Sequence, residues 1–412
     1  MNNGYEEYIA LKSSGQINFQ QIQLSSSKSE SNRALIINAL SGNRGALQNL
    51  SNARDTRTME RLLQSSDELL DVLDAGTTMR FLTAYVAMSA KSPKIITGSP
   101  RMQERPIKIL VEALNEIGAT ITYQENEGYP PLLISPFEKQ RTDIIKIPSN
   151  ISSQYISALL MVAPVFPNGL TIELVGEIYS RPYIMMTLEI MKKFGIIYAW
   201  TGQVISIEPQ SYSSGEYSIE SDWSGASYWY GLVSLADNGS VCLKGLRKDS
   251  YQGDQAIVGI MNDLGIESQF DSEGVTLTKK TSKSSLEIDF RNCPDLAQTV
   301  MATAAGKRVH LKMTGLESLK IKETDRIAAL QTELSRTGTR LIEDGSTWIL
   351  DSTDFNLKPG TLFETYDDHR MAMSFAPLSM IAPIRIENPG VVEKSYPGYW
   401  DDLKSVGIKM TQ

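Results

Sequence analysis

The chain has very few of the residues that build disulfide frameworks and most metal sites. Among its 412 residues are two cysteines, Cys242 and Cys293, and two histidines, His310 and His369. Cysteines so sparse and so far apart fit a reducing cytoplasm and exclude a disulfide framework or a cysteine metal site. His310 lies in an alternating, strand-like stretch and is interpreted as structural. We therefore expect neither metal nor cofactor, and chemistry that depends on carboxylates, lysine and arginine.

The sequence also lacks the long apolar runs of membrane proteins. Residues 1–7 are acidic and polar, so neither a secretory signal nor a transit peptide is expected there. A hydrophobic content of 41% and a charged content of 21% are ordinary values for a globular protein. The chain is long enough for two or three domains. These features predict a cytoplasmic protein with no membrane partner.

Positive charge is local rather than general in this chain, whose formal net charge is -8. Basic residues gather beside glycine or serine in short clusters, at residues 27–33, 74–80, 101–106, 322–326 and 367–370. Nucleic acid requires a broad basic face, whereas cationic turns on an acidic protein suit a small polyanion. The pattern favours small anionic ligands and argues against a nucleic-acid partner.

One pattern recurs along the chain: an amphipathic helix, a glycine and a short strand-like run. The glycines are spaced by 77, 70, 73 and 69 residues and are Gly118, Gly195, Gly265, Gly338 and Gly407. A glycine just past a helix supplies the left-handed cap that turns the chain into the next strand. The spacing predicts copies of one α+β unit, each too small to fold alone. One period earlier lies Gly45, where the pattern is eroded, and residues 58–73 look like one helix. We expect six units, the first of them shortened.

No low-complexity linker divides the chain. Small polar residues near 25–27 and 220–222 mark the expected domain joints. A chain that crosses twice between two lobes places its first strand, 17–24, with the C-terminal half. We expect one lobe of residues 1–26 plus 221–412, a second of residues 27–220, and an active site in the cleft between them.

Three basic motifs in the N-terminal half could hold anions. Residues 27–33 precede an apolar helix, and Lys28 and Arg33 could complete a phosphate or carboxylate cradle at its start; an ordinary capped helix start is the alternative. Gly76 permits close backbone approach to a ligand, or serves only as a hinge. Arg101 offers forked donors from a stiff loop, whereas Arg105 is expected to pair with Glu104 or a helix C-terminus.

Two further helix starts offer hydroxyls and amides suited to a sugar-like ligand, although each could be a plain N-cap. The residues concerned are Ser152, Ser153, Gln154, Ser180 and Tyr183.

The C-terminal half contains the carboxylates best suited to proton transfer. Lys322 and Arg326 are four residues apart and would share a face in a helix's first turn. Glu323 beside them could exchange a proton, or belong to a solvated salt-bridge ladder. Asp295 opens an apolar helix, either as an N-cap or facing a site. Arg370 marks another helix start, and Lys394 lies in the polar loop 392–397.

In order and spacing these motifs resemble the 5-enolpyruvylshikimate-3-phosphate synthase family over nearly the whole chain. The resemblance implies an α/β fold, a two-lobed inverse α/β barrel with three βαβαββ units per lobe. It also implies a metal-free reaction: phosphoenolpyruvate and shikimate 3-phosphate give an enolpyruvyl ether and inorganic phosphate. That reaction lies on the shikimate pathway to chorismate and the aromatic amino acids.

The resemblance also implies residue roles. Asp295 would take the proton of the attacking 5-hydroxyl, and Glu323 or Lys28 would protonate the enol carbon. The residues implied for shikimate 3-phosphate are Lys28, Ser29, Arg33, Ser152, Ser153, Gln154, Ser180, Tyr183, Asp295, Ser318 and Lys322. Those implied for phosphoenolpyruvate are Lys28, Gly76, Arg101, Gln154, Arg326, Arg370 and Lys394. These two small molecules are the only partners expected, and a monomer is expected.

The chain departs from the family pattern in three places. Asp74 and Ser318 each stand where the family usually has asparagine, and the segment 55–74 is shorter than usual. The nearest alternative is a transferase that acts on UDP-N-acetylglucosamine, but that family commonly carries a reactive cysteine in the loop matched here by residues 98–106, which contain none. A non-catalytic anion-binding homologue is a second alternative, although binding alone would require neither Asp295 nor Glu323.

Overall fold

The computed structural model describes residues 8–150 and 152–411, and the acidic segment 1–7 considered above lies outside them. The chain forms two compact units: unit 1 comprises Met1–Ser25 and Glu220–Gln412, and unit 2 comprises Ser26–Ile219. Each unit has a hydrophobic core of its own. Within the described residues, no helix is both long and apolar enough to cross a membrane.

One βαβαββ topology recurs in the four-stranded sheets of both units. The first two strands are parallel and joined through a helix, and a second helix leads into an antiparallel pair. In unit 2 the orders are β4-β5-β7-β6 and β8-β9-β11-β10. The strands are β4 (Leu69–Asp71), β5 (Lys94–Thr97), β6 (Thr120–Tyr123), β7 (Leu132–Ser135), β8 (Ile144–Pro148), β9 (Leu170–Val175), β10 (Ala199–Thr201) and β11 (Val204–Ile207).

Unit 1 repeats this topology in the orders β2-β13-β15-β14, β16-β17-β19-β18 and β20-β21-β1-β22. Its strands are β1 (Tyr8–Lys12), β2 (Gln20–Gln23), β13 (Val241–Lys244), β14 (Ile266–Phe270), β15 (Gly274–Lys279), β16 (Ser285–Asp289), β17 (His310–Thr314), β18 (Arg340–Asp344), β19 (Thr347–Asp351), β20 (Thr361–Phe363), β21 (Ile384–Glu387) and β22 (Lys409–Thr411). The N-terminal β1 and β2 thus complete two sheets of the C-terminal half. The strand expected over residues 17–24 corresponds to β2, and β1 was not predicted.

The first unit of the repeat is shortened, as expected. Its sheet has only two strands, β3 (Ala46–Gln48) and β12 (Glu216–Ser218), which pair in parallel. The single helix expected over residues 58–73 is wrong: α2 (Arg54–Gln64) ends before β4, because Leu69–Asp71 pair with β5 as an edge strand. The left-handed glycine of this unit is Gly42, with φ 78°, rather than Gly45.

The five spaced glycines are confirmed as left-handed turns between helix and strand. Their φ angles lie between 78° and 133°, a region that residues with a side chain rarely adopt. The helices before them are amphipathic and cover the sheets; in α5, for example, Leu110, Leu114 and Ile117 lie on one buried face. These helices are α5 (Lys108–Ile117), α7 (Arg181–Lys193), α9 (Ile257–Asp263), α11 (Arg326–Ser335) and α13 (Tyr399–Ser405).

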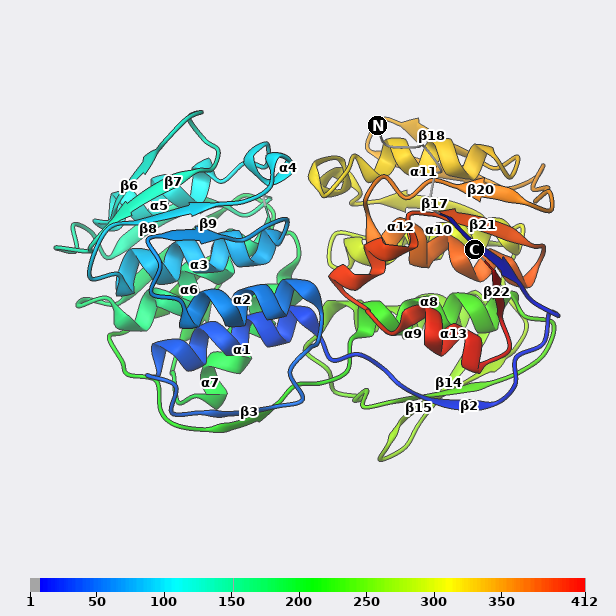
Figure 1. Cartoon of the computed structure of the whole chain (residues 1–412), viewed down its shortest axis with the longest axis horizontal. Coiled ribbons are helices and arrows are strands. Elements are labelled where there is room, and N and C mark those ends of the chain that lie inside the picture. The colour runs from blue at the N-terminus through cyan, green and yellow to red at the C-terminus, as the bar shows by residue number, and fades with distance from the viewer. Residues whose placement is uncertain (1–7, 151, 412) are drawn as a thin grey trace. The chain divides into compact units, whose positions relative to one another are not determined.

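A second set of helices is buried on nearly every side and packs together at the centre of each unit (Figure 1). In unit 2 these are α1 (Lys28–Leu40), α3 (Gly76–Ser89) and α6 (Ser153–Val162). In unit 1 they are α8 (Trp223–Leu235), α10 (Ala297–Gly306) and α12 (His369–Phe375). The shorter helical segments are α4 (Pro100–Gln103), η1 (Ala163–Val165), η2 (Gly253–Ala256), η3 (Pro294–Leu296), η4 (Glu317–Ile321), η5 (Ala376–Met380) and η6 (Pro389–Lys394). Sheets outside and helices inside make an inverse α/β barrel, the predicted fold class.

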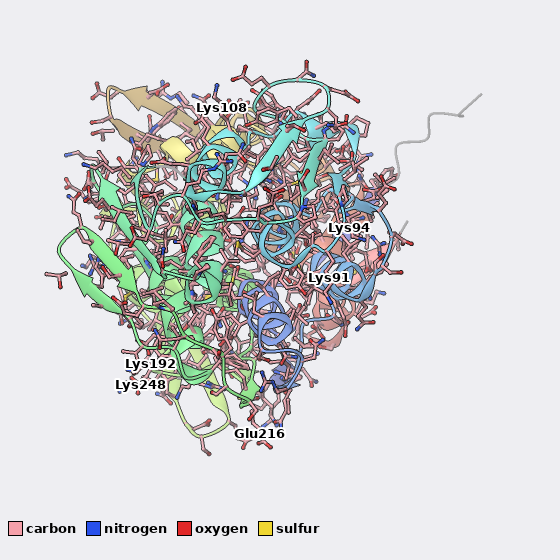
Figure 2. The ribbon with its side chains drawn as sticks, turned by 90° about the vertical axis from the view of Figure 1, so that its left-hand side faces the viewer. Lys91, Lys94, Lys108, Lys192, Glu216 and Lys248 are labelled. Carbon is pink, nitrogen blue, oxygen red and sulfur yellow. The ribbon has the colours of Figure 1, made fainter. Side chains whose placement is uncertain are left out.

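Charged side chains on the outer surface of unit 2 are dispersed. In Figure 2, Lys91 and Lys94 stand near each other, while Lys108 and Lys192 lie elsewhere on the unit. Lys108 pairs with Glu127 at 2.6 Å. Clusters of polar side chains lie instead at the starts of the central helices, around Asp55 in unit 2 and Asp295 in unit 1.

Candidate active site

The starts of α1, α2, α3 and α6 meet within unit 2. Lys28 Nζ lies 3.0 Å from Asp55 Oδ2, and Thr78 donates to the Asp55 carbonyl at 3.3 Å. Gln154 Nε2 donates to Thr77 Oγ1 at 3.2 Å. We call Lys28, Asp55, Gly76, Thr77 and Gln154 the unit 2 cluster. Free N–H groups and the positive ends of helix dipoles converge there, which favours an anion.

Capping differs among these helix starts. Ser27 accepts a hydrogen bond from Glu30 N in α1, and Ser152 accepts one from Gln154 N in α6. The start of α3 has no side-chain cap at Ala75. The first N–H groups of α3, from Gly76 onward, are thus left for a ligand or solvent.

Arg33 was predicted to bind a ligand, but its contacts lie inside unit 2. The side chain is 2% exposed; Nε donates to Thr187 at 2.7 Å and Nη2 to Ser157 at 3.1 Å. Nη1 donates to the Ser29 carbonyl at 2.8 Å. Burial lowers the pKa of Arg33 to about 10, although Tyr183 and Glu30 counteract it. The described geometry makes Arg33 a support for the start of α1.

The loop of Arg101 and Arg105 lies beside the start of α3. The partner that the structure describes for Glu104 is Arg101, at 2.8 Å, in an exposed ion pair. Arg105 packs over Gly76, because a Cβ added to that glycine would lie 2.4 Å from Arg105 Nη1. Arg105 therefore borders the uncapped start of α3 more closely than the sequence suggested.

The remaining predicted residues of unit 2 also lie at helix starts. Ser153 is buried in the first turn of α6. Ser180 is the left-handed N-cap of α7, with φ 54°, but its side chain does not cap the helix. Tyr183 follows in the first turn of α7, where its phenol influences Arg33 electrostatically.

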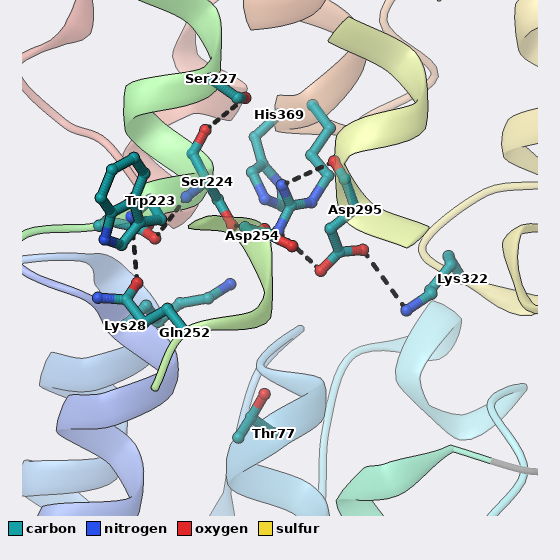
Figure 3. Close-up of polar contacts among 12 residues, drawn as sticks. Lys28, Thr77, Trp223, Ser224, Ser227, Gln252, Asp254, Asp295, Lys322 and His369 are labelled. Atoms are coloured by element: carbon teal, nitrogen blue, oxygen red, sulfur yellow. Dashed lines mark hydrogen bonds and ion pairs between the residues drawn. The ribbon is translucent and has the colours of Figure 1, made fainter. Parts of the chain in front are cut away.

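A second cluster forms in unit 1 around Asp295. Its carboxylate lies 2.9 Å from Arg370 Nη2, 3.1 Å from Arg326 Nη1 and 3.6 Å from Lys322 Nζ. Figure 3 shows the Asp295 side chain directed toward Lys322. The N-cap interpretation of Asp295 does not apply, since α10 begins after Leu296 without a side-chain cap. We call Asp295, Lys322, Glu323, Arg326 and Arg370 the unit 1 cluster.

Arg326 is the buried centre of this cluster. It donates to Asp368 Oδ2 at 2.6 Å and to Glu323 Oε2 at 2.8 Å, besides Asp295. Lys394, only 3% exposed, lies 4.0 Å from the other oxygen of Glu323. Lys394 is thus buried in the cluster rather than placed in a solvated loop. The half-buried Ser318 lies nearby in sequence, in η4.

The cations shift the ionisation of Asp295. Burial raises its pKa, but Arg370, Lys322 and Arg326 outweigh burial and hold the pKa well below its usual range. The carboxylate is therefore ionised at neutral pH and can accept a proton. Its low pKa also makes it a weak base in the ligand-free protein.

The helical interpretation of residues 322–326 is wrong in its detail. Helix α11 begins only at Arg326, and Asp325 caps it by accepting from Ile327 N and Ala328 N at 3.1 Å. Lys322 and Glu323 precede the helix, so the spacing of four does not place Lys322 and Arg326 on one helical face. Both reach Asp295 nevertheless, because the chain turns at Lys322 into the cap.

Sequence reasoning missed three polar residues that contact these clusters: Asp55, Ser224 and Asp254. Asp55 and Asp254 are each 2% exposed, and Ser224 donates to Asp254. No cation adjoins Asp254 in sequence, so the basic clusters did not point to it. A carboxylate directly after glycine at a helix start was the available signal. In the described parts of the chain, no group of three or more His, Cys, Asp or Glu side chains is placed to hold a metal ion.

Comparison with known proteins gives concordant results. Residues 60–403 match the model of the family described as EPSP synthase (3-phosphoshikimate 1-carboxyvinyltransferase). A 3-phosphoshikimate 1-carboxyvinyltransferase of Bacteroides fragilis is 49% identical over 94% of this chain and 95% of its own. One from Aliivibrio salmonicida is 35% identical over 94% of this chain and 97% of its own. A solved EPSP synthase from Acinetobacter baumannii has the same fold, with a TM-score of 0.79 at 18% identity, covering 98% of this chain and all of that one.

Proposed function

Because the chain belongs to the EPSP synthase family, we propose that its two clusters of helix starts together bind shikimate 3-phosphate and phosphoenolpyruvate and carry out enolpyruvyl transfer between them. The chain is a transferase of the shikimate pathway, which leads to chorismate and aromatic amino acids. In the proposed reaction the 5-hydroxyl of shikimate 3-phosphate attacks the central carbon of phosphoenolpyruvate. The methylene carbon gains a proton and becomes a methyl group, and loss of phosphate together with one proton of that methyl group then gives the enolpyruvyl ether.

The observation that carries the proposal is the environment of Asp295. A single carboxylate held by three cations, with Glu323 on the same arginine, provides anion binding and proton exchange together. Asp295 would accept the proton of the attacking hydroxyl. Glu323 or Lys28 would protonate the methylene carbon.

Charge balance explains how a carboxylate of such low basicity could act as a base. Two unit charges 4 Å apart at an effective dielectric of about 20 interact by about 4 kcal/mol. Anionic substrate groups that pair with Arg370, Arg326 and Lys322 would relieve Asp295 of part of that attraction. Its pKa would then rise toward the usual range once both substrates are bound.

We propose the two ligand sets that the family resemblance implies, grouped here by unit. Lys28, Ser29, Ser152, Ser153, Gln154, Ser180 and Tyr183 of unit 2, and Asp295, Ser318 and Lys322 of unit 1, would hold shikimate 3-phosphate. Lys28, Gly76, Arg101 and Gln154 of unit 2, and Arg326, Arg370 and Lys394 of unit 1, would surround phosphoenolpyruvate. Arg33 would act through Ser29, whose carbonyl it holds.

Phosphate release tests the proposed reaction directly. Purified protein is incubated with phosphoenolpyruvate and either shikimate 3-phosphate or UDP-N-acetylglucosamine. Release only with shikimate 3-phosphate is the expected result. Release only with the nucleotide sugar would establish the sister reaction, and release with neither would leave a binding protein.

We also propose that the enzyme is a cytoplasmic monomer. The two cysteines, Cys242 and Cys293, are buried and unbridged, as a reducing compartment allows. Sedimentation equilibrium of the purified chain tests the monomer, and a mass of 45.7 kDa is expected.

A further inference from the structure

Asp254 is a buried carboxylate of unit 1 to which the proposed reaction gives no role. It lies in η2, is 2% exposed and accepts a hydrogen bond from Ser224 Oγ. The same hydroxyl lies 3.3 Å from Arg370 Nη2, which donates to Asp295 Oδ2 at 2.9 Å. Asp254, Ser224, Arg370 and Asp295 are thus connected in one chain of polar contacts, and Figure 3 shows Asp254 beside Ser224 with Asp295 next to it.

Two carboxylates therefore act on one guanidinium, Asp295 by direct contact and Asp254 through the hydroxyl of Ser224. The charged groups that act on Asp254 are Asp295 from η3, Arg370 from α12 and Asp222 from the start of α8, and the thiol of Cys293 lies within their influence. Burial raises the pKa of Asp254 to about 6, and Asp295 adds to the rise. The pKa of Asp295 moves in the opposite direction. Neighbouring carboxyl groups whose environments separate their pKa values take different protonation roles.

A purely structural role does not explain why a carboxylate stands at this position. The hydroxyl of Ser224 could donate equally well to a neutral amide. A buried negative charge beside Asp295 and Asp222 is unfavourable, since like charges raise one another's pKa. The carboxylate of Asp254 adds a second electrostatic attraction on Arg370. Without it, Arg370 would neutralise the charge of Asp295 more fully.

We propose that Asp254 is a positioning residue for enolpyruvyl transfer: through Ser224 and Arg370 it preserves the ability of Asp295 to accept the proton of the attacking hydroxyl. The inference rests on the proposed function. The ionised form of Asp254 attracts Arg370 and weakens its interaction with Asp295, so the pKa of Asp295 rises. Protonation of Asp254 releases Arg370 to Asp295, and turnover slows.

The kinetic test compares Asp254→Asn with wild type at saturating concentrations of both substrates. The pKa of Asp254 is about 6 in the ligand-free protein, and bound anions that pair with Arg370 would raise it, so the wild-type kcat is expected to fall in acid at or above pH 6. Asp254→Asn should lower kcat roughly tenfold at pH 8 and leave both KM values nearly unchanged. Its kcat should also lack the acid limb, which is the fall in kcat that the wild type shows in acid. Asp254→Glu should restore part of the rate and the limb. Ser224→Ala, which breaks the link and keeps both carboxylates, should lower kcat in the same direction.

Asp402 supplies a matched control. It is a carboxylate of the same unit that accepts a hydrogen bond from Tyr396, and burial also raises its pKa. Asp402→Asn should leave the pH profile of kcat intact. A wild-type profile in Asp254→Asn, or a lower kcat with the acid limb unchanged, would overturn the proposal.

Titration of the ligand-free protein separates this inference from the proposed function. Carbon-13 resonances of labelled aspartate carboxyls should include one that titrates at about pH 6 and is missing in Asp254→Asn. Asp295→Asn should lower the pKa of that resonance by removing a neighbouring negative charge. An unshifted resonance would disprove the coupling, whereas absence of turnover with a shifted resonance would count against the reaction alone.

Discussion

The two clusters of helix starts occupy equivalent places in one repeated topology, yet they differ in composition. The unit 2 cluster is formed largely by hydroxyl, amide and backbone groups, with Lys28 and Asp55 as its described ion pair. The unit 1 cluster is a network of three cations around Asp295, with Arg326 buried among carboxylates. The scaffold therefore fixes where helix starts meet, and the residues at those starts fix the chemistry. Under the proposed function, the unit 1 cluster contributes the base Asp295, whereas most of the proposed ligand residues in unit 2 offer hydroxyl, amide or backbone groups.

Removal of the Asp295 carboxylate should produce the largest effect. Asp295→Asn keeps the shape and removes the base, so kcat is expected to fall by roughly 10²–10⁴-fold. Binding of shikimate 3-phosphate, measured by calorimetry, should change little. Asp55→Asn is the counterpart in unit 2 and should raise KM values more than it lowers kcat. Equal losses of kcat in the two variants would erase the proposed difference between the clusters.

Loss of the buried arginine should destabilise the protein. Arg326→Met strips Asp368, Glu323 and Asp295 of a shared cation and should cost about 3–5 kcal/mol of unfolding free energy. Denaturant unfolding measures the change. The exposed pair of unit 2 provides the control, because Arg101→Met should cost less than about 1 kcal/mol. A small loss for Arg326→Met would show that the network does not hold unit 1 together.

Asp254 should make the protein less stable as the pH rises, whereas acids with a lowered folded-state pKa make a protein more stable as the pH rises. Burial raises the pKa of Asp254 from 3.8 to about 6, so the folded state holds its proton more tightly than the unfolded state. That contribution is present at low pH and is lost as pH rises through about 6. Asp254→Asn should therefore stabilise the protein at pH 8 by up to about 3 kcal/mol, and by little near pH 4. Thermal unfolding at the two pH values checks this, and equal shifts at both would contradict it.

A methyl group at the start of α3 should act through Arg105. The Cβ of Gly76→Ala would lie 2.4 Å from Arg105 Nη1, so the guanidinium must move. We expect KM for phosphoenolpyruvate to rise roughly fivefold or more. Gly259→Ala is the control, since its Cβ meets nothing within 4 Å. An unchanged KM would leave Gly76 as a hinge only.

The smallest effect should come from Asp74, the residue that departs from the family pattern near α3. Its charge is paired with Arg54 at 2.7 Å, and both side chains are more than a third exposed. Asp74→Asn should change unfolding free energy by less than about 1 kcal/mol. KM for phosphoenolpyruvate should fall by less than about threefold. A larger fall would mean that Asp74 acts on the anion despite its partner.

The fold was predictable where the sequence carries a local physical requirement. Left-handed turns require glycine, so the spacing of Gly118 through Gly407 revealed the repeat. Amphipathic helices such as α5 were predictable because one buried face gives the sequence a helical hydrophobic period. The central helices are buried all round and carry no period, and β4 is too short to be separated from a helix by pattern.

The site was predictable where cations adjoin small residues, and less so elsewhere. The cations Lys322, Arg326 and Arg370 indeed meet at Asp295. Arg33 belongs to the same kind of motif but is enclosed by Thr187 and Ser157, which are distant in sequence. Asp254 was missed because its cationic neighbour comes from another helix. Such differences depend on tertiary contacts that no local pattern encodes.

Strand β1 has a consequence for how the protein is made. It lies between β21 and β22, which come after unit 2 in the chain and are therefore synthesised long after β1. The residues of unit 2 form one uninterrupted stretch, so all its strands exist before the second half of the chain has been synthesised. Strand β1 therefore lacks both of its hydrogen-bonding partners until β21 and β22 have been synthesised. Removal of β1 would divide this sheet at its middle and leave β22 without a hydrogen-bonded neighbour among the described strands.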